Sequence, residues 1–175
     1  KDESAFRKWT SDRYDTYPIT AEDMNHKYIE CNGDCSEPDN FYPLTAFDET
    51  GIVGHLILRF TGKEKKVIRF GFVIVDDTKR GKGYGKEMLK LALKFSFDIL
   101  KAEKATLGVF DNNPSAYYCY KAAGFKDVKM DKDIVFSFFL FCYIHKTAPL
   151  FLLSISLYTE LKDMSIRYYR YGITI

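Results

Sequence analysis

Apolar and polar positions alternate in blocks along the first half of the chain, and these blocks predict three successive strands. Apolar runs occupy residues 44–47, 52–60 and 67–75, and short polar turns that contain Gly51 and Gly62 separate them. Strands joined by such tight turns form an antiparallel meander. The third run is almost wholly apolar and rich in β-branched residues, so we expect this strand to be buried on both faces.

The spacing of apolar residues changes after the third strand. From residue 83 to about residue 100 they recur at helical spacing, with lysines on the opposite side. Residues 105–110 have the pattern of a short strand. Residues 114–123 have that of a short helix, with Asn113 as a suitable N-cap and Gly124 at its C-terminal end. A meander followed by helix, strand and helix predicts a mixed α/β (α+β) fold around one central sheet.

The N-terminal part of the chain carries weaker signals. Thr20, followed three residues later by Asp23, resembles a helix start. Residues 31–43 contain glycine, two prolines and Asp-Asn, so we expect a loop there.

The C-terminal part is unusually apolar. Residues 134–144 and 150–158 are rich in Phe, Leu and Ile, and a short polar stretch separates them. Three interpretations stay open: two strands that complete the sheet, a membrane span that the polar stretch interrupts, and a partner interface. We favour strands, exchanged or packed between the subunits of a homodimer, and expect no membrane span. Residues 159–175 fit no pattern that we can name.

Composition and charge narrow the class of protein. With 46% hydrophobic and 29% charged residues, residues 1–175 are expected to form a single globular domain. The net charge of +2 gives no reason to expect a nucleic-acid partner. The first 23 residues are polar and charged, so we expect no signal peptide. The cysteines have neither zinc-finger spacing nor the density of a disulfide framework, which favours reduced thiols, no metal and a cytoplasmic protein. They are Cys31, Cys35, Cys119 and Cys142.

The segment between the third strand and the long helix combines glycines with cations. It reads Arg80-Gly81-Lys82-Gly83-Tyr84-Gly85-Lys86. Alternate glycines let the backbone turn tightly and approach a ligand, and the helix that follows begins with free N–H groups and the positive end of its dipole. We therefore expect a phosphate or pyrophosphate. The dinucleotide and Walker fingerprints both fail because Lys86 occupies a required glycine position. Taken alone, the loop is equally an ordinary glycine-rich turn that caps a helix.

Two motifs together resemble the GNAT superfamily of N-acetyltransferases. Arg80, Gly83 and Gly85 fill the family's R/Q-x-x-G-x-G/A motif, and the block N-x-x-A-x-x-x-Y-x-x-x-G-F runs from Asn113 to Phe125. The resemblance covers about residues 44–128, which would form the cofactor-binding core. It implies that acetyl-CoA is the acetyl donor and that a primary amine on a small molecule or a protein attacks it directly in a ternary complex.

The resemblance also implies roles for single residues. The backbone of Val73, Ile74 and Val75 would pair with the pantetheine arm of the cofactor, and Asn113 would contact the cofactor from the end of the next strand. Tyr120 falls where many members place a tyrosine beside the thioester sulfur, so it is the candidate general acid, against the alternative of a packed aromatic. The pyrophosphate cradle would consist of Arg80, Gly81, Lys82, Gly83, Tyr84, Gly85 and Lys86.

The sequence does not identify a general base. Four carboxylates lie near elements that line the family's cleft, and each is more simply a solvated turn residue, while a water chain is the alternative. They are Glu30, Asp76, Asp77 and Asp111. His55 lies within a predicted strand, which favours a structural role.

Two other functions compete with an enzyme. The first is a cofactor-binding module that has lost catalysis and senses acyl-CoA. The second is a structural or membrane-associated protein, which only the apolar residues 134–158 support. An intact Tyr120 and an unbroken glycine loop favour the enzyme, and the sequence does not specify its acceptor.

Overall fold

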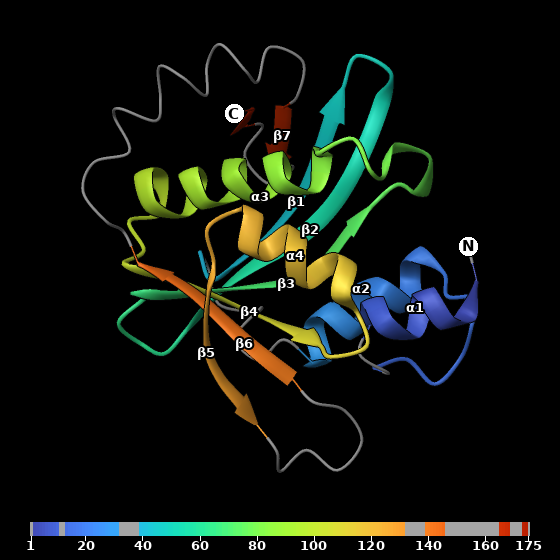
Figure 1. The fold of residues 1–175 in the computed structure, drawn as a ribbon, viewed down its shortest axis with the longest axis horizontal. Helices are drawn as coiled ribbons and strands as arrows, with labels where there is room; N and C mark the ends of the chain where they lie inside the picture. The colour runs from blue at the N-terminus through green and yellow to red at the C-terminus, as the bar shows by residue number, and fades with distance from the viewer. Residues whose placement is uncertain are drawn as a thin grey trace.

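One mixed β-sheet organises the fold (Figure 1). The computed structural model describes residues 2–10, 13–31, 39–131, 139–145, 165–168 and 173–174. The strand order is β5-β6-β4-β3-β2-β1-β7-β8, and within this order only β3 and β4 pair in parallel. The strands are β1 (Phe41–Asp48), β2 (Gly51–Thr61), β3 (Val67–Val75), β4 (Lys104–Phe110), β5 (Lys126–Asp131), β6 (Phe139–His145), β7 (Ser165–Tyr168) and β8 (Ile173–Thr174).

Helices cover both faces of this sheet. On one face α3 and α4 close the main core, to which Met88 and Tyr120 belong. On the other face α1 packs through Phe6 against Ile57 of β2, because successive residues of a strand point to opposite faces. The helices are α1 (Glu3–Thr10), α2 (Ala21–Cys31), α3 (Tyr84–Lys94), which continues into the π-helical turn η3 (Phe95–Ile99), α4 (Pro114–Ala122) and the short 3-10 helix η2 (Asp77–Lys79).

The predicted meander is confirmed, and its first strand is longer than expected. Strands β1, β2 and β3 pair antiparallel in succession. Residues 41–43, expected in a loop, belong to β1 although they include Pro43. Strand β7 pairs with β1 only from Leu44 onward, so Pro43 lies outside the stretch of β1 that has a neighbour on both sides. A proline is tolerated in such a position because no ladder hydrogen bond is lost there.

Strand β3 has the predicted bounds but not the predicted burial on both faces. Its buried residues alternate with half-buried ones, and a β-bulge interrupts the alternation. The register passes from His55 opposite Ile74 to Ile57 opposite Gly71, which leaves one extra residue on β3. At the bulge Phe72 has φ +48° and turns its ring toward α1, where it lies 5.6 Å from the ring of Trp9. Such a backbone costs roughly 1–3 kcal/mol, and bulges of this kind re-aim groups beside functional sites.

The predicted helix starts are also confirmed. Thr20 and Asp23 form a reciprocal cap: the Asp23 N–H donates to Thr20 Oγ1 (3.1 Å), and the Thr20 N–H donates to Asp23 Oδ2 (2.7 Å). Asn113 caps α4, where its Oδ1 accepts from the Ala116 N–H at 3.3 Å. Gly124 follows α4 with φ +105°.

The C-terminal strands differ from the expectation. The hairpin after α4 is made by β5 and β6, so residues 126–131 form a strand that the sequence analysis did not predict. Only Val128 and Met130 alternate there among lysines and aspartates, which makes the strand pattern weak. Strand β6 overlaps the first apolar run and extends one residue beyond it, to His145, and residues 150–158 lie outside the described residues. Within the described part of the chain, no helix is long and apolar enough to cross a membrane.

We expect acid to destabilise the fold through His55, well before carboxylates titrate. Burial on β2 lowers the pKa of His55 from 6.5 to about 4. Between these values the unfolded chain binds a proton that the folded chain does not, so the free energy of unfolding falls as pH falls from 6.5 to 4, by up to about 3 kcal/mol. Urea unfolding at several pH values measures this slope.

His55→Gln serves as the comparison because its side chain does not titrate. Its unfolding free energy should change much less across the same window. Asp48, whose pKa is lowered, contributes mainly below about pH 5 and does so equally in both proteins, so its effect cancels in the comparison. Equal slopes for the two proteins would contradict the prediction.

Candidate active site

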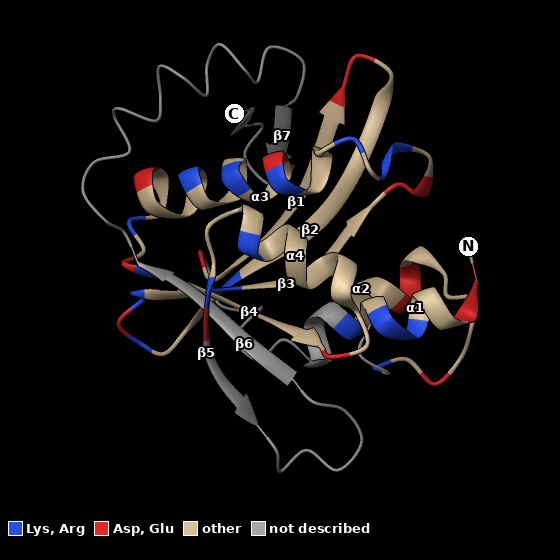
Figure 2. Ribbon diagram, viewed as in Figure 1, with Lys and Arg blue, Asp and Glu red and all other residues tan. Residues whose placement is uncertain are grey.

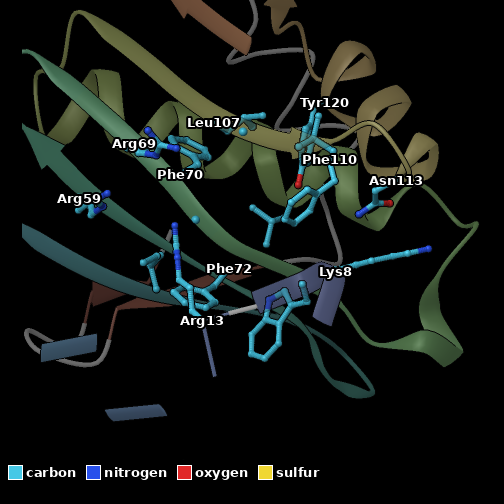
Figure 3. A pocket seen from close by; sticks show the side chains of 16 residues that line it. Lys8, Arg13, Arg59, Arg69, Phe70, Phe72, Leu107, Phe110, Asn113 and Tyr120 are labelled. Carbon is cyan, nitrogen blue, oxygen red and sulfur yellow. The ribbon is translucent and has the colours of Figure 1, made fainter. Parts of the chain in front are cut away.

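Strands β3 and β4 separate part of the way along their length. Their parallel register runs only from Val67 opposite Lys104 to Arg69 opposite Thr106. Beyond this point β3 stays paired with β2, whereas β4 pairs with β6. A pocket occupies the opening, between residues 69–73 of β3 and 107–110 of β4 (Figure 3). The separation therefore exposes the edges of two central strands to a ligand.

Tyr120 of α4 and Asn113, the N-cap of this helix, both line the pocket. They are seven residues apart, about two helical turns, so both lie on the same side of the helix. Tyr120 is 7% exposed, and its ring packs 6.4 Å from that of Phe125. Figure 3 shows its hydroxyl pointing into the pocket. The structure thus brings Tyr120, Asn113 and Val73 together around one cavity, where a proton donor faces the opening.

The glycine loop at the end of β3 has an open backbone. Gly81 and Gly83 have φ +76° and +86°, a region that residues with a side chain rarely adopt. No atom lies within 4 Å of a Cβ built at either position, so the loop leaves space for an approaching ligand. Helix α3 starts at Tyr84 and directs its first N–H groups toward this space. These donors and the nearby cations suit a pyrophosphate.

Gly85 is required for a different reason from the other two glycines. A Cβ there would lie 3.0 Å from Cys119 Sγ and 3.5 Å from Val75 Cγ2. The glycine lets α3 approach α4 and the end of β3. Burial raises the pKa of the Cys119 thiol, which suits a packing role.

The cations of the loop are partly used to hold its shape. Figure 2 shows basic segments along the chain that leads into α3. The Arg80 side chain donates through Nε to the Val75 carbonyl (3.0 Å), and Lys86 Nζ lies 3.1 Å from Glu87 Oε1. Both residues remain at the loop, where their charge stays close to any bound phosphate.

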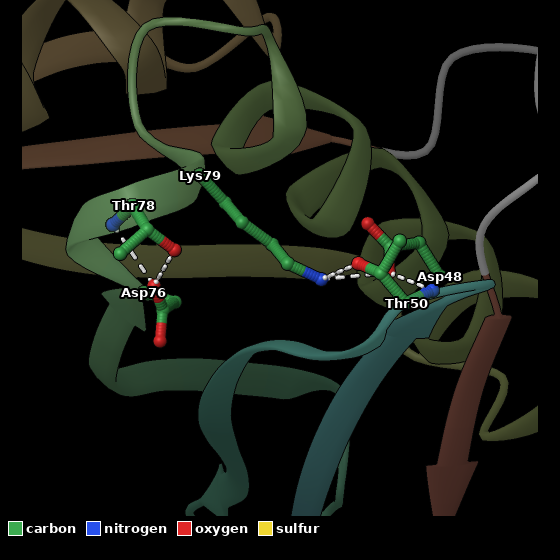
Figure 4. A network of polar contacts seen from close by, with 5 residues as sticks. All are labelled: Asp48, Thr50, Asp76, Thr78 and Lys79. Carbon is green, nitrogen blue, oxygen red and sulfur yellow. Dashed lines mark hydrogen bonds and ion pairs between the residues drawn. The ribbon is translucent and has the colours of Figure 1, made fainter.

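Lys79 serves as an anchor of the loop. Its ammonium donates to Asp48 Oδ1 at 2.6 Å and to Thr50 Oγ1 at 2.8 Å (Figure 4). The Lys79 and Asp48 side chains are only 14% and 6% exposed. The hydrogen bond from Lys79 holds the pKa of Asp48 well below its usual range. This contact spans 31 residues, so no local signal in the sequence predicts it.

Three of the four carboxylates considered as bases, Asp76, Asp77 and Asp111, do not line the pocket. Asp76 caps η2, where its Oδ1 accepts from the Thr78 N–H at 2.9 Å. Neither Asp77 nor Asp111 lines the cavity, and the Glu30 side chain lies outside the described part of the chain. The described lining contains no Asp, Glu or His. No His, Cys, Asp or Glu side chains among the described residues form a group that could hold a metal ion.

Several residues of the pocket were not anticipated. Trp9 and Arg13 come from the N-terminal segment, and Arg59 and Arg69 come from β2 and β3. The sequence contains a signal for Arg59 and Arg69, because each is a charged residue inside an otherwise apolar strand.

Known proteins share this architecture. The Vibrio cholerae spermidine N-acetyltransferase, solved in complex with CoA and spermine, superimposes with a TM-score of 0.65 at 20% identity, covering 82% of this chain and 83% of that one. A dodecameric structure of spermidine N-acetyltransferase from Vibrio cholerae gives a TM-score of 0.59 at 20% identity, covering 82% and 87%. These likenesses establish the fold.

Sequence comparison adds the family. The spermine/spermidine N(1)-acetyltransferase of Bacillus subtilis (strain 168) is 28% identical over 108 residues, which cover 57% of this chain and 71% of the relative. Residues 3–125 match the acetyltransferase (GNAT) family, including α1, α2, the glycine loop and α4. The chain therefore belongs to the acetyltransferase (GNAT) family, as its two motifs predicted.

Proposed function

We propose that this chain transfers the acetyl group of acetyl-CoA to a primary amine that attacks it directly in the pocket between β3 and β4. The observation that carries the proposal is the convergence of the open glycine loop, the separated strand edges and the Tyr120 hydroxyl at one end of the sheet. Acetyl-CoA, as a thioester, supplies the acetyl group in activated form. The chain has to bind it, orient it and move protons.

The residues of the chain divide these tasks. The N–H groups at the start of α3 and the cations of the loop would hold the pyrophosphate. The β3 edge at Val73, Ile74 and Val75 would pair with the pantetheine arm as an added strand does. The bulge at Phe72 lies beside the opening, where a backbone N–H of β3 would polarise the acetyl carbonyl. Tyr120 would hold the proton that the departing sulfur takes up.

Binding of the cofactor is testable by melting. Acetyl-CoA should raise the melting temperature, whereas ATP and NAD should not, because the loop lacks both of their fingerprints. A ligand at a hundredfold excess over its Kd stabilises the native state by about 2.7 kcal/mol, which a melt resolves. Release of free thiol with a panel of amines then separates an enzyme from an acyl-CoA sensor. An equal shift with ATP, or binding without thiol release, would contradict the proposal.

The domain, assembly and location are part of the proposal. Residues 1–175 would act as a single domain, and a homodimer would form through the apolar segment 134–158, most of which lies outside the described residues. The four cysteines support a cytoplasmic location, because their spacing suits neither a disulfide framework nor zinc. The small net charge supports partners other than nucleic acid.

The relatives suggest polyamines as acceptors, since the Bacillus subtilis relative is named for spermine and spermidine. A polyamine carries several positive charges at neutral pH. Whether polyamines are acceptors of this chain therefore depends on the charged side chains that line its pocket.

A further inference from the structure

Three arginine side chains gather at one end of the pocket. Arg13 precedes α2, Arg59 belongs to β2, and Arg69 is the last residue of β3 that pairs with β4. Figure 3 shows their guanidinium groups on one side of the cavity, while Lys8 extends away on the other. The guanidinium carbon of Arg13 lies 5.5 Å from the centre of the Phe72 ring. The described lining of the cavity contains Lys and Arg side chains and no Asp or Glu.

The arginine cluster (Arg13, Arg59 and Arg69) brings like charges close together. Arg59 and Arg69 are direct cross-strand partners in the β2–β3 register, and like charges in such positions are destabilising. Burial, and then the positive charges of Arg59 and Arg13, lower the pKa of Arg69. Like charges held close together inside a pocket are typical of a binding site, where function outweighs local stability.

Trp9 lines the same pocket and carries a buried hydrogen-bond donor. Its Nε1 is buried and makes no hydrogen bond within the described part of the chain. The indole N–H only donates, so a ligand atom that satisfies it must be an acceptor. Guanidinium groups likewise only donate, and their planar fork matches carboxylate and phosphate oxygens. The donors of this end of the pocket therefore point to an anionic ligand.

The arginine cluster is separate from the site predicted for the cofactor's pyrophosphate. Arg69 lies near the start of β3, and the glycine loop follows Val75 at its end. Six residues of strand span about 20 Å, so a pyrophosphate on the loop would not reach the cluster. Tyr120 lines the same cavity as the arginines, which places a ligand of the cluster beside the candidate acid.

We infer that the acceptor is a primary amine that also carries a carboxylate or phosphate group, and that Arg13, Arg59 and Arg69 bind this group. The inference rests on the proposed acetyl transfer and specifies its substrate class. A polyamine in the same pocket would bring its additional positive charges against three guanidinium groups. Spermine and spermidine are therefore poor acceptors for this chain.

The test compares amines of equal length and different charge. The panel contains 5-aminopentanoate and 5-aminopentyl phosphate as anions, pentylamine as the neutral-tailed amine, and 1,5-diaminopentane and spermidine as polycations; L-glutamate adds an α-amine. Thiol release gives kcat/KM for each. We expect the best anion to exceed pentylamine by about 10- to 100-fold, the value of a charge-assisted contact, and both polycations to fall below pentylamine. A preference for polycations overturns the inference, and the two anion types separate carboxylate from phosphate.

Substitutions in the arginine cluster test whether it causes the preference for anionic amines. Arg69→Met should lower the kcat/KM ratio of 5-aminopentanoate to pentylamine by about 10-fold or more, mainly through KM. A melting curve shows whether the fold survives the substitution, which keeps an apolar stem at this position. Arg13→Met, which leaves the sheet untouched, should lower the same ratio if Arg69→Met fails to fold. Lys63→Met removes an exposed charge from the β2–β3 turn and should leave the ratio unchanged. An unchanged ratio in both arginine variants overturns the inference.

A second readout keeps the inference distinct from the proposed transfer. If no amine releases thiol, the transfer itself fails, and ligand binding then tests the cluster alone. In that case 5-acetamidopentanoate should raise the melting temperature and N-acetyl-1,5-diaminopentane should not. A rise in melting temperature with N-acetyl-1,5-diaminopentane and none with 5-acetamidopentanoate overturns the inference, whether or not the chain releases thiol.

Discussion

Replacing Gly83 by valine is expected to weaken acetyl-CoA binding by about 100-fold or more, because two or more charge-assisted contacts of the loop would be lost. Gly83 has φ +86° and caps α3 from outside the helix. A β-branched residue strains this backbone and places its methyl groups in the open space that the phosphates would use. Calorimetric titration of acetyl-CoA, or the shift that it produces in a melt, measures the loss.

Gly62→Val is the matched control. Gly62 has φ +88°, and no atom lies within 4 Å of a Cβ built there, so the backbone strain is comparable. It lies in the turn between β2 and β3, at the opposite end of β3 from the loop. Both variants should lose similar stability, roughly 1–3 kcal/mol, and only Gly83→Val should lose the cofactor. Normal binding by Gly83→Val would locate the pyrophosphate elsewhere.

Much of the fold follows from local sequence signals. The bounds of β3, the Thr20–Asp23 cap and the Asn113 cap could be predicted because turn and cap chemistry acts within a few residues. The two motifs sufficed to indicate the family, which the match over residues 3–125 confirms. That match also includes α1 and α2, a region for which the sequence pattern was weak.

Other features depend on contacts between distant segments. The pairing of Asp48 with Lys79 arises when the β1–β2 turn meets the loop after β3, and neither residue predicts it alone. The bulge at Phe72 is a matter of register between β2 and β3, which an apolar run does not specify. Strand β5 is too polar to show a clear alternation of apolar and polar residues, and its pairing with β6 determines its structure.

Sequence motifs indicated the residues that we propose for cofactor binding, but not those that we propose for acceptor binding. The glycine loop and Tyr120 belong to contiguous motifs, whereas Arg13, Arg59 and Arg69 come from three elements that only the fold brings to one cavity. The cross-strand pair Arg59–Arg69 illustrates the difference. Each residue looks like an isolated charge in the sequence, and their opposition appears only in the register.

Tyr120→Phe is expected to lower kcat by about 10²- to 10⁴-fold while acetyl-CoA affinity changes little, since acid catalysis of this kind contributes that range. The substitution keeps the ring, its burial and its packing against Phe125, and removes only the hydroxyl that points into the pocket. A thiol with a pKa near 8.5 is a fairly good leaving group, so the loss should lie toward the lower end of the range. The measurement is turnover with the best amine of the panel, together with a melting curve.

Tyr118→Phe separates chemistry from packing in this test. It removes the same oxygen from the same helix, but the Tyr118 side chain is 69% exposed and lies outside the cavity lining. Its turnover should equal that of the wild type. The pH dependence adds a second criterion: if the Tyr120 hydroxyl supplies a proton, its removal should alter the alkaline limb of the kcat profile. A packed aromatic without a catalytic role predicts the opposite pattern, in which Tyr120→Phe changes the melting temperature and leaves both turnover and the pH profile as they are. That outcome would remove Tyr120 from the mechanism and leave the positioning of amine and thioester in the β3–β4 opening as the main source of catalysis.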